Sequence, residues 1–203
     1  MSEPRPRFRS ICVFCGSRPG SFDEYPRAAK TLGALLGRKG IELIYGGGHV
    51  GLMGMVADAA LQAGGRVTGV ITRALHDKEI AHTGITDLIV VESMHQRKAM
   101  MSEKAEAFIA LPGGFGTFEE LFEVVTWAQL GIHEKPVGLL NVRGYYDPVM
   151  QQVDVAIAEG FVRAEHRNLL AITEDPELLL IQMDNYKPVH VPKWLDRTET
   201  WTT

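Results

Sequence analysis

The sequence AFIALPGGFGTFEE, from Ala107 to Glu120, places a short apolar run before a glycine-rich turn and a segment with helical spacing. The apolar run Ala107–Leu111 has the length and composition of a buried strand. Glycine permits backbone conformations that other residues avoid, so three glycines within four residues indicate a tight turn. The stretch therefore predicts a strand that passes directly into a loop and a helix, which is the repeating step of an α/β sheet.

The same alternation continues along the chain on both sides of this stretch. The predicted strands are Ser10–Cys15, Ile41–Tyr45, Arg66–Ile71, Asp87–Val91, Ala107–Leu111, Pro136–Val142 and Leu169–Thr173. The predicted helices are Asp23–Lys39, Gly51–Ala63, Met94–Lys104, Thr117–Leu130, Asp147–Glu159 and Pro176–Tyr186. Continuous rather than alternating apolar strands are typical of a parallel sheet that is covered on both faces. We expect a doubly wound, Rossmann-like α/β fold with a parallel sheet of about seven strands, in which ligands bind beyond the carboxyl ends of the strands.

Charge and composition narrow the class of protein. The chain has 203 residues, a formal net charge of −4 and no basic run, so it lacks the electrostatic footprint of a nucleic-acid-binding protein. Its longest stretch without Asp, Glu, Lys or Arg, Leu43–Ala57, is too short and too rich in glycine to span a membrane. The apolar run after the N-terminal arginines is too short for a secretory signal. With only two cysteines, the protein is expected in the reducing cytoplasm.

The length indicates a single domain. Domains of about 100–200 residues are common, so we expect residues 1–203 to form one α/β domain. Its ends, Met1–Phe8 and Lys187–Thr203, are expected to be ragged.

A second glycine loop, GGGHVG at residues 46–51, lies between a predicted strand and a predicted helix. Its spacing matches the dinucleotide-binding pattern GxGxxG, and a helix N-terminus can bind a phosphate. The loop follows the second strand rather than the first, and the next strand leads into Thr72 and Arg73 instead of the acidic residue that binds a ribose. A tight turn that packs a helix on the sheet explains these glycines equally well.

The glycine turn at residues 113–116 is a stronger candidate for a binding site than the glycine loop at residues 46–51. Gly113, Gly114 and Gly116, with a helix that begins at or near Thr117, would form an anion-binding cradle, although the lysine spacing of a Walker loop is absent. Thr117 and Glu120 also have the spacing of a capping box, in which Glu120 would only satisfy a backbone N–H group. Three glycines exceed what a cap requires, which favours a binding role.

A basic pair opens the helix after the fourth strand. Arg97 and Lys98 could make a bidentate contact and a point-charge contact with a phosphate. From these residues alone, an ordinary solvated helix face is the favoured interpretation. His95 could act as a base, but a lone histidine is more often structural.

Redox and metal chemistry find little support in the sequence. Cys12 and Cys15 have redox-pair spacing, yet two residues three apart in a strand point to opposite faces of the sheet. The seven histidines show no metal-binding spacing. We therefore expect two buried structural cysteines and no metal.

These motifs resemble those of the LONELY GUY family of cytokinin-activating nucleoside 5′-monophosphate phosphoribohydrolases, many of which carry an older lysine decarboxylase label. Pro112–Glu120 matches the family motif PGGxGTxxE, and Arg97 with Lys98 matches its arginine–lysine pair. The likeness covers roughly Ser10–Phe161 and fades beyond it. The family hydrolyses the N-glycosidic bond of N6-substituted adenosine monophosphates, giving the free base and ribose 5-phosphate. The resemblance implies the same reaction here, with AMP as a further candidate substrate and no cofactor.

The resemblance also implies roles for individual residues. Arg97 and Glu120 would form the catalytic pair. The residues expected to bind the nucleotide are Gly47, Gly48, Glu79, Lys98, Gly113, Gly114, Gly116, Thr117 and Thr126. Glu79 lies in a loop that departs from the family pattern. The family likeness further implies a homodimer, with the site completed across the interface.

The chemistry of the implied pair agrees with the reaction. Glycosidic cleavage passes through an oxocarbenium-like state, which a nearby carboxylate such as Glu120 stabilises or supplies with an activated water. Arg97 stays protonated at neutral pH, so we assign it to orienting the nucleotide and to stabilising charge on the departing base or the phosphate.

Two other functions stay open at this point. One is an NADP-dependent oxidoreductase that uses the glycines at 46–51 and binds a 2′-phosphate with Arg73. The other is a non-enzymatic module that binds nucleotides. The decarboxylase label has little support, because nothing in the sequence specifies a Schiff-base lysine with a partner for the pyridinium of a pyridoxal cofactor.

Overall fold

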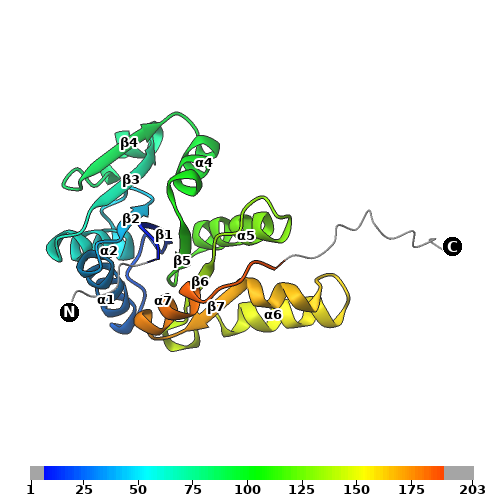
Figure 1. The fold of residues 1–203 in the computed structure, drawn as a ribbon. Helices are drawn as coiled ribbons and strands as arrows, with labels where there is room; N and C mark the ends of the chain where they lie inside the picture. The colour runs from blue at the N-terminus through cyan, green and yellow to red at the C-terminus, as the bar shows by residue number, and fades with distance from the viewer. Residues whose placement is uncertain (1–6, 190–203) are drawn as a thin grey trace.

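A parallel sheet with helices on both faces forms the fold in the computed structural model (Figure 1). The structure describes residues 7–189, and within them the sheet has seven strands in the order β4-β3-β2-β1-β5-β6-β7. The strands are β1 (Ser10–Phe14), β2 (Glu42–Tyr45), β3 (Val67–Thr72), β4 (Asp87–Val91), β5 (Ala107–Ala110), β6 (Val137–Leu140) and β7 (Leu170–Thr173). All neighbouring pairs are parallel, which confirms the predicted doubly wound α/β fold.

The helices follow the predicted alternation with small shifts at their ends. They are α1 (Glu24–Arg38), α2 (Gly51–Gln62), α3 (Arg73–Leu75), α4 (Met94–Lys104), α5 (Phe115–Gln129), α6 (Asp147–Ala158) and α7 (Pro176–Asp184). Three further helical turns are η1 (His76–Ile80), η2 (Val142–Gly144) and η3 (Ala164–Leu169). The short segments α3, η1, η2 and η3 were not predicted, because runs of three to six residues carry too little periodicity.

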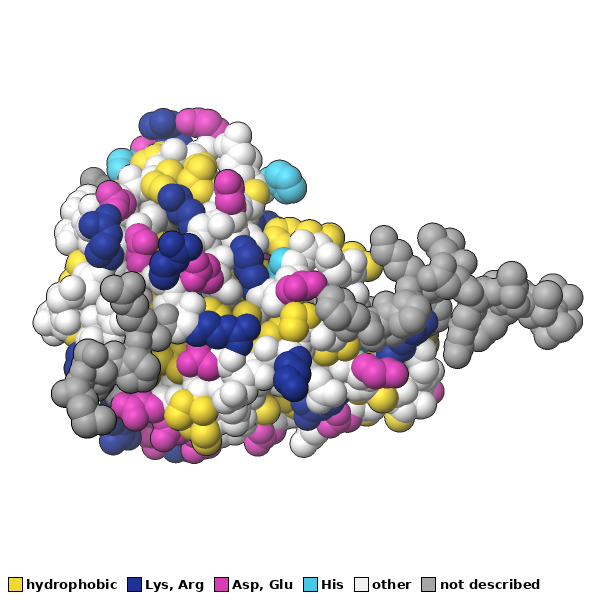
Figure 2. Space-filling model, in the orientation of Figure 1, with side chains coloured by type: hydrophobic (Ala, Val, Ile, Leu, Met, Phe, Trp, Pro, Cys, Tyr) yellow, Lys and Arg dark blue, Asp and Glu magenta, His cyan; other side chains and the backbone are white. Residues whose placement is uncertain are grey.

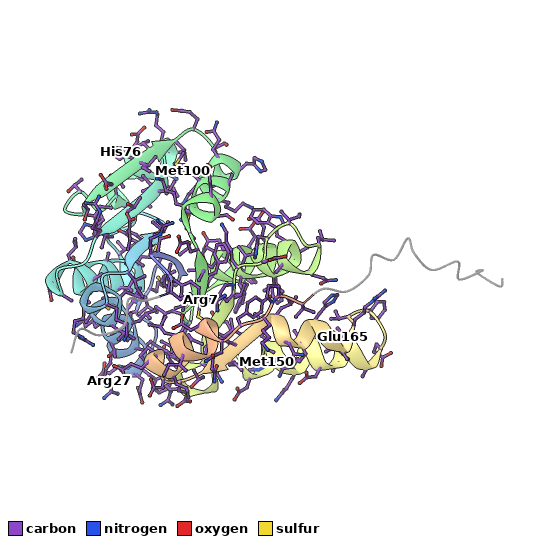
Figure 3. All side chains as sticks on the ribbon, viewed as in Figure 1. Arg7, Arg27, His76, Met100, Met150 and Glu165 are labelled. Carbon is purple, nitrogen blue, oxygen red and sulfur yellow. The ribbon has the colours of Figure 1, made fainter. Side chains whose placement is uncertain are left out.

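Two apolar clusters pack against the opposite faces of the sheet. Helices α1 and α2 contribute Leu32 and Val56 to one cluster, whereas α4 and α6 contribute Met101 and Met150 to the other. Figure 1 shows α1 and α2 on one side of the sheet and α4 and α5 on the other. Figure 3 labels Met150 on α6 and Arg27 on α1, in these two different layers. Burial on both faces explains why the strand sequences are continuously apolar.

The two cysteines are divided between these clusters. Cys12 packs with the α4–α6 layer and Cys15 with the α1–α2 layer, and both are buried, free thiols. Burial raises the pKa of both thiols, which opposes formation of the reactive thiolate. The prediction that they point to opposite faces is confirmed.

The described surface carries charges of both signs. On the face shown in Figure 2, Lys and Arg side chains are interspersed with Asp and Glu, and the described residues visible there form no continuous basic surface. Within residues 7–189, no helix combines the length and apolar character needed to cross a bilayer. The predicted ragged ends, Met1–Phe8 and Lys187–Thr203, lie largely outside the described residues.

Candidate functional site

The site begins where the order of the strands reverses. β1 lies between β2 and β5, and Phe14 of β1 is paired in register with Ala110 of β5. Beyond these strand ends, Gly16 N–H donates a hydrogen bond of 3.1 Å to the Pro112 carbonyl. Doubly wound sheets bind ligands in the crevice at this reversal. The loop that follows β5 therefore lies at the position where a ligand is expected.

Helix α5 begins two residues earlier than predicted. Gly114 is its extended N-cap residue, and the first hydrogen bond of the helix runs from Phe118 N–H to the Gly114 carbonyl, at 3.0 Å. The N–H groups of Phe115, Gly116 and Thr117 are therefore not used within the helix. Unused N–H groups and the positive end of the helix dipole favour an anion at this position.

The capping-box interpretation of Thr117 and Glu120 is wrong. Thr117 lies inside the first turn of α5, buried against Gly113, where a Cβ atom on Gly113 would lie 2.1 Å from the Thr117 hydroxyl oxygen. By contrast, Cβ positions on Gly114 and Gly116 have no atom within 4 Å. The loop is thus tightly packed at its base and open at its rim, as a cradle for a phosphate requires.

Arg97 and Glu120 form a buried ion pair beside this loop. Arg97 Nη1 lies 3.0 Å from Glu120 Oε1, and the exposed fractions of the two side chains are 9% and 12%. Arg97 Nε also donates to the Val70 carbonyl of β3, at 2.9 Å. A Cβ atom at Gly46 would lie 2.1 Å from Arg97 Nη2, so a side chain there would displace the guanidinium. The guanidinium therefore connects the ends of β2 and β3 with α5.

The interpretation of Arg97 as part of a solvated helix face is wrong. Ser93 caps α4 by accepting a hydrogen bond from Gln96 N–H, so the helix begins at Met94 and its first turn directs Arg97 toward the sheet. The carboxylate and the carbonyl that receive the guanidinium lie on other elements, which sequence spacing cannot reveal. His95 remains exposed at the start of the helix.

Burial controls the protonation of Glu120. Desolvation raises the pKa of its carboxyl group above the ordinary range, and the Arg97 charge and hydrogen bond oppose this effect. Burial is the larger of these effects, so the net change in the pKa of Glu120 is upward. A carboxyl group whose pKa moves toward neutral is better able to exchange a proton at physiological pH.

Lys98 forms ion pairs with two carboxylates of α5. Its ammonium group donates to Glu119 and to Glu123, with 2.9 Å between Lys98 Nζ and Glu123 Oε1. Both contacts raise the pKa of Lys98 and keep it charged. Lys98 thus joins α4 to α5 next to the Arg97–Glu120 pair.

The glycine loop after β2 is used largely for packing. Gly47 has a positive φ of 75°, and its carbonyl accepts a hydrogen bond from His82 N–H, at 2.8 Å. Gly48 forms an isolated bridge with Ala81. A Cβ atom at Gly51 would lie 2.3 Å from the carbonyl carbon of Ser17, so this glycine lets α2 approach the loop after β1. These contacts agree with the tight-turn interpretation more than with a dinucleotide loop.

Of two further predicted binding residues, only Thr126 has a described side chain, and it is not brought to the Arg97–Glu120 pair. Glu79 lies in η1, and its side chain is outside what the structure describes. Thr126 is exposed on α5, six residues after Glu120. At 100° per residue this spacing turns Thr126 about 120° around the helix, away from the buried carboxylate.

Two residues that hold the base of the candidate cradle were not predicted from the sequence. Tyr145 and Tyr146 donate hydroxyl hydrogen bonds to the carbonyls of Gly113 and Leu111. The signal that could have indicated them is their chemistry, because a tyrosine in a buried segment usually forms a hydrogen bond through its hydroxyl group.

Comparison with known proteins gives a consistent set of relatives. A family model described as "Possible lysine decarboxylase" matches residues 53–183. Cytokinin riboside 5′-monophosphate phosphoribohydrolase LOG2 of Arabidopsis thaliana is 48% identical over 207 residues, which cover 100% of this chain and 97% of that protein. The enzyme LOG7 of the same species is 50% identical over 188 residues, covering 93% and 87%. The enzyme LOG of Oryza sativa subsp. japonica is 48% identical over 186 residues, covering 92% and 77%.

Solved structures with low sequence identity share the fold. The molybdenum cofactor binding protein of Rippkaea orientalis has a TM-score of 0.65 at 24% identity, covering 91% of this chain and 98% of that one. The Moco carrier protein of Chlamydomonas reinhardtii has a TM-score of 0.65 at 18% identity, covering 90% and 98%. At these identities the likeness extends to the fold alone.

Proposed function

The chain belongs to the LONELY GUY family of cytokinin riboside 5′-monophosphate phosphoribohydrolases, and we propose that it hydrolyses the N-glycosidic bond of N6-substituted adenosine 5′-monophosphates. The products are the free base and ribose 5-phosphate, and AMP is a second candidate substrate. The observation that carries this proposal is the buried Arg97–Glu120 pair beside an open glycine loop at the strand reversal. It combines a carboxylate with an anion cradle, the two groups that this reaction requires.

In the proposed reaction, Glu120 acts at the anomeric carbon. The C1′–N9 bond breaks and its electron pair leaves with the base, so positive charge develops on the ribose. The Glu120 carboxylate stabilises that charge and accepts a proton from the water that attacks C1′, and this proton then neutralises the departing base. Burial strengthens the effect, because a fixed charge acts more strongly where water is excluded.

Arg97 interacts with the negative charges of the reaction, those of the departing base or of the phosphate. One of its nitrogens is bound to Glu120 and another to the Val70 carbonyl, so the guanidinium has a fixed orientation. From this position we assign it to orienting the nucleotide and to stabilising negative charge on the departing base or the phosphate.

The phosphate is assigned to the loop after β5. Gly114, Gly116 and Thr117 would bind it through backbone N–H groups at the start of α5, and Gly113 allows Thr117 to pack beneath. Gly47, Gly48 and Glu79 are proposed to line the nucleotide from the neighbouring loop. Lys98 is proposed to act at the edge of the site, where it also balances the charges of two glutamates.

We assign Thr126 to a site shared between two copies of the chain. Thr126 lies on one exposed stripe of α5 with Phe115 and Phe122, since spacings of seven and eleven residues return to the same side of a helix. The exposed fractions of the two phenylalanines are 92% and 46%. A homodimer that covers this stripe would bury both rings and bring Thr126 to the partner's site. The cytoplasmic location and the single domain of residues 1–203 stay predictions.

The rival activities fit the described residues less well. Arg73, the candidate for binding a 2′-phosphate, forms an ion pair with Glu92 at 3.2 Å. A Schiff-base lysine needs a neutral amine, whereas the contacts of Lys98 favour its charged form.

The test is to incubate the protein with N6-isopentenyladenosine 5′-monophosphate and with AMP, and to assay free base and ribose 5-phosphate by chromatography. We expect equal amounts of base and sugar phosphate, and no specific binding in an absorbance titration with NADPH. Binding of both nucleotides without release of base during a long incubation would instead indicate a nucleotide-binding module.

A further inference from the structure

Two adjacent tyrosines hold the loop that follows β5. Tyr146 donates its hydroxyl hydrogen to the Leu111 carbonyl, at 2.6 Å, and Tyr145 donates to the Gly113 carbonyl. Both tyrosines lie between η2 and α6, more than thirty residues away in the sequence. A segment outside the family motif PGGxGTxxE therefore fixes the backbone of the loop that carries this motif.

Only the hydrogen bond from Tyr145 orients a backbone donor. In a trans peptide the C=O and N–H groups point in opposite directions, and residues 7–189 contain no cis peptide bond. Fixing the Gly113 carbonyl therefore directs the N–H group of Gly114 away from the tyrosine. The Leu111 carbonyl belongs to the peptide bond with Pro112, which has no N–H group to direct.

The Gly114 peptide group needs such an anchor. Gly114 is exposed, and a Cβ atom there would have no atom within 4 Å, so side-chain packing does not restrain it. Because glycine has wide conformational freedom, the peptide group between Gly113 and Gly114 has more freedom to rotate, if it is not anchored, than one between two residues with side chains.

The Tyr145 ring is itself held in place by aromatic neighbours. It stacks on Phe118 with 6.3 Å between ring centroids and an interplanar angle of 17°. It also packs edge-on against Tyr146 at 5.2 Å and against Tyr25 at 6.1 Å. These contacts position the hydroxyl group before a ligand arrives, so the cradle is preorganised.

We propose that Tyr145 is a positioning residue for the phosphate end of the substrate: its hydroxyl group fixes the Gly113 carbonyl and thereby aims the Gly114 N–H group at the phosphate. This inference rests on the proposed function, since it assigns the loop after β5 to the 5′-phosphate. Tyr145 does not touch the reacting atoms. Its effect is on the binding of ligands that carry a phosphate.

The test compares Tyr145→Phe with Tyr25→Phe in the full chain. Both changes remove one hydroxyl group from the same aromatic cluster, but only Tyr145 is bonded to the loop. We measure KM and kcat for AMP and its N6-isopentenyl derivative, the Kd of ribose 5-phosphate by calorimetry, and inhibition by adenosine, which has no phosphate. Thermal melting reports on folding.

The expected result is selective for the phosphate. Tyr145→Phe should raise KM and the Kd of ribose 5-phosphate by about three- to tenfold, as the loss of one hydrogen bond predicts. The value of kcat and inhibition by adenosine should change less than twofold, because a contact made equally in the ground state and the transition state affects KM alone. Tyr25→Phe should match the wild type in all four measurements.

Other outcomes overturn the inference. If Tyr145→Phe weakens the binding of adenosine and of ribose 5-phosphate equally, Tyr145 only supports the fold. If the variant binds both ligands as the wild type does, Tyr145 has no role in positioning the phosphate. If the wild type releases no base, the proposed function fails. The calorimetric comparison still decides the inference in that case, because weaker ribose 5-phosphate binding by Tyr145→Phe alone supports it and any other result contradicts it.

Discussion

Replacing Arg97 with methionine leaves the Glu120 carboxylate without its partner in a buried position. The two side chains are 9% and 12% exposed and lie 3.0 Å apart, so water cannot take over the role of the guanidinium. Removing one member of a buried ion pair costs about 3–5 kcal/mol. At about 2–4 °C per kcal/mol for a chain of this size, the melting temperature at pH 8 should fall by roughly 10 °C.

The loss should depend on pH in a defined direction. Burial already raises the pKa of Glu120, and removing the Arg97 charge raises it further. A carboxyl group with a raised pKa in the folded state binds a proton more readily folded than unfolded, so stability increases as the pH falls toward its ordinary pKa near 4.3. Relative to the wild type at each pH, Arg97→Met should therefore recover much of its stability at pH 5. The lost hydrogen bond to the Val70 carbonyl, about 1 kcal/mol, should remain at both pH values.

The assay is thermal or urea denaturation of the wild type, Arg97→Met, Glu120→Gln and the double variant at pH 5 and pH 8. At pH 8 the double variant should be more stable than Arg97→Met, because its buried side chain carries no charge. The reasoning is refuted if Arg97→Met loses equal stability at both pH values and if the two single effects add in the double variant. That pattern would mean that only packing was lost.

Three other changes test separate parts of the structure. Gly46→Ala places a Cβ atom 2.1 Å from Arg97 Nη2 and should lower kcat about 10- to 100-fold in steady-state kinetics. The control Gly84→Ala, whose Cβ atom would have no neighbour closer than 3.4 Å, should leave kcat unchanged, and equal behaviour of the two variants would refute the prediction. Phe122→Glu should convert a dimer into a monomer in sedimentation velocity, and a monomeric wild type would contradict the shared site. Burial lowers the pKa of His166, so its protonation should reduce the stability of the protein as the pH falls below about 6.5. In urea denaturation, His166→Leu should therefore gain more stability over the wild type at pH 5.5 than at pH 8. An equal difference between the two proteins at both pH values would count against this.

The fold could be predicted because its signals are local. The strand Asp87–Val91, which is apolar after its first residue, and the following helix Met94–Lys104 have the predicted bounds in the structure. The start of α5 was misplaced by two residues, because Gly114 rather than Thr117 is the N-cap. The segment Arg73–Ile80 was missed, since its short helical turns carry little periodicity; its last residue is bonded to the loop after β2, where His49 N–H donates to the Ile80 carbonyl.

The candidate site was only partly visible in the sequence. The local spacing of the glycines at 113–116 predicts a loop, but the burial of Arg97 depends on Gly46, in the loop after β2, and on Val70 of β3. Likewise, the contact between Tyr145 and Gly113 joins residues 32 positions apart. Such contacts arise from the strand order, so no short stretch of sequence contains them.

The central claim is that the Glu120 carboxylate drives hydrolysis, and its most direct test is single-turnover release of free base from N6-isopentenyladenosine 5′-monophosphate. Glu120→Gln should bind the nucleotide within a few-fold of the wild type but release base at least about 100-fold more slowly, since the amide can neither carry the charge nor accept the proton. The matched change Glu119→Gln, at the neighbouring exposed carboxylate, should leave the rate nearly unchanged. Release of base by Glu120→Gln at the wild-type rate would contradict the account.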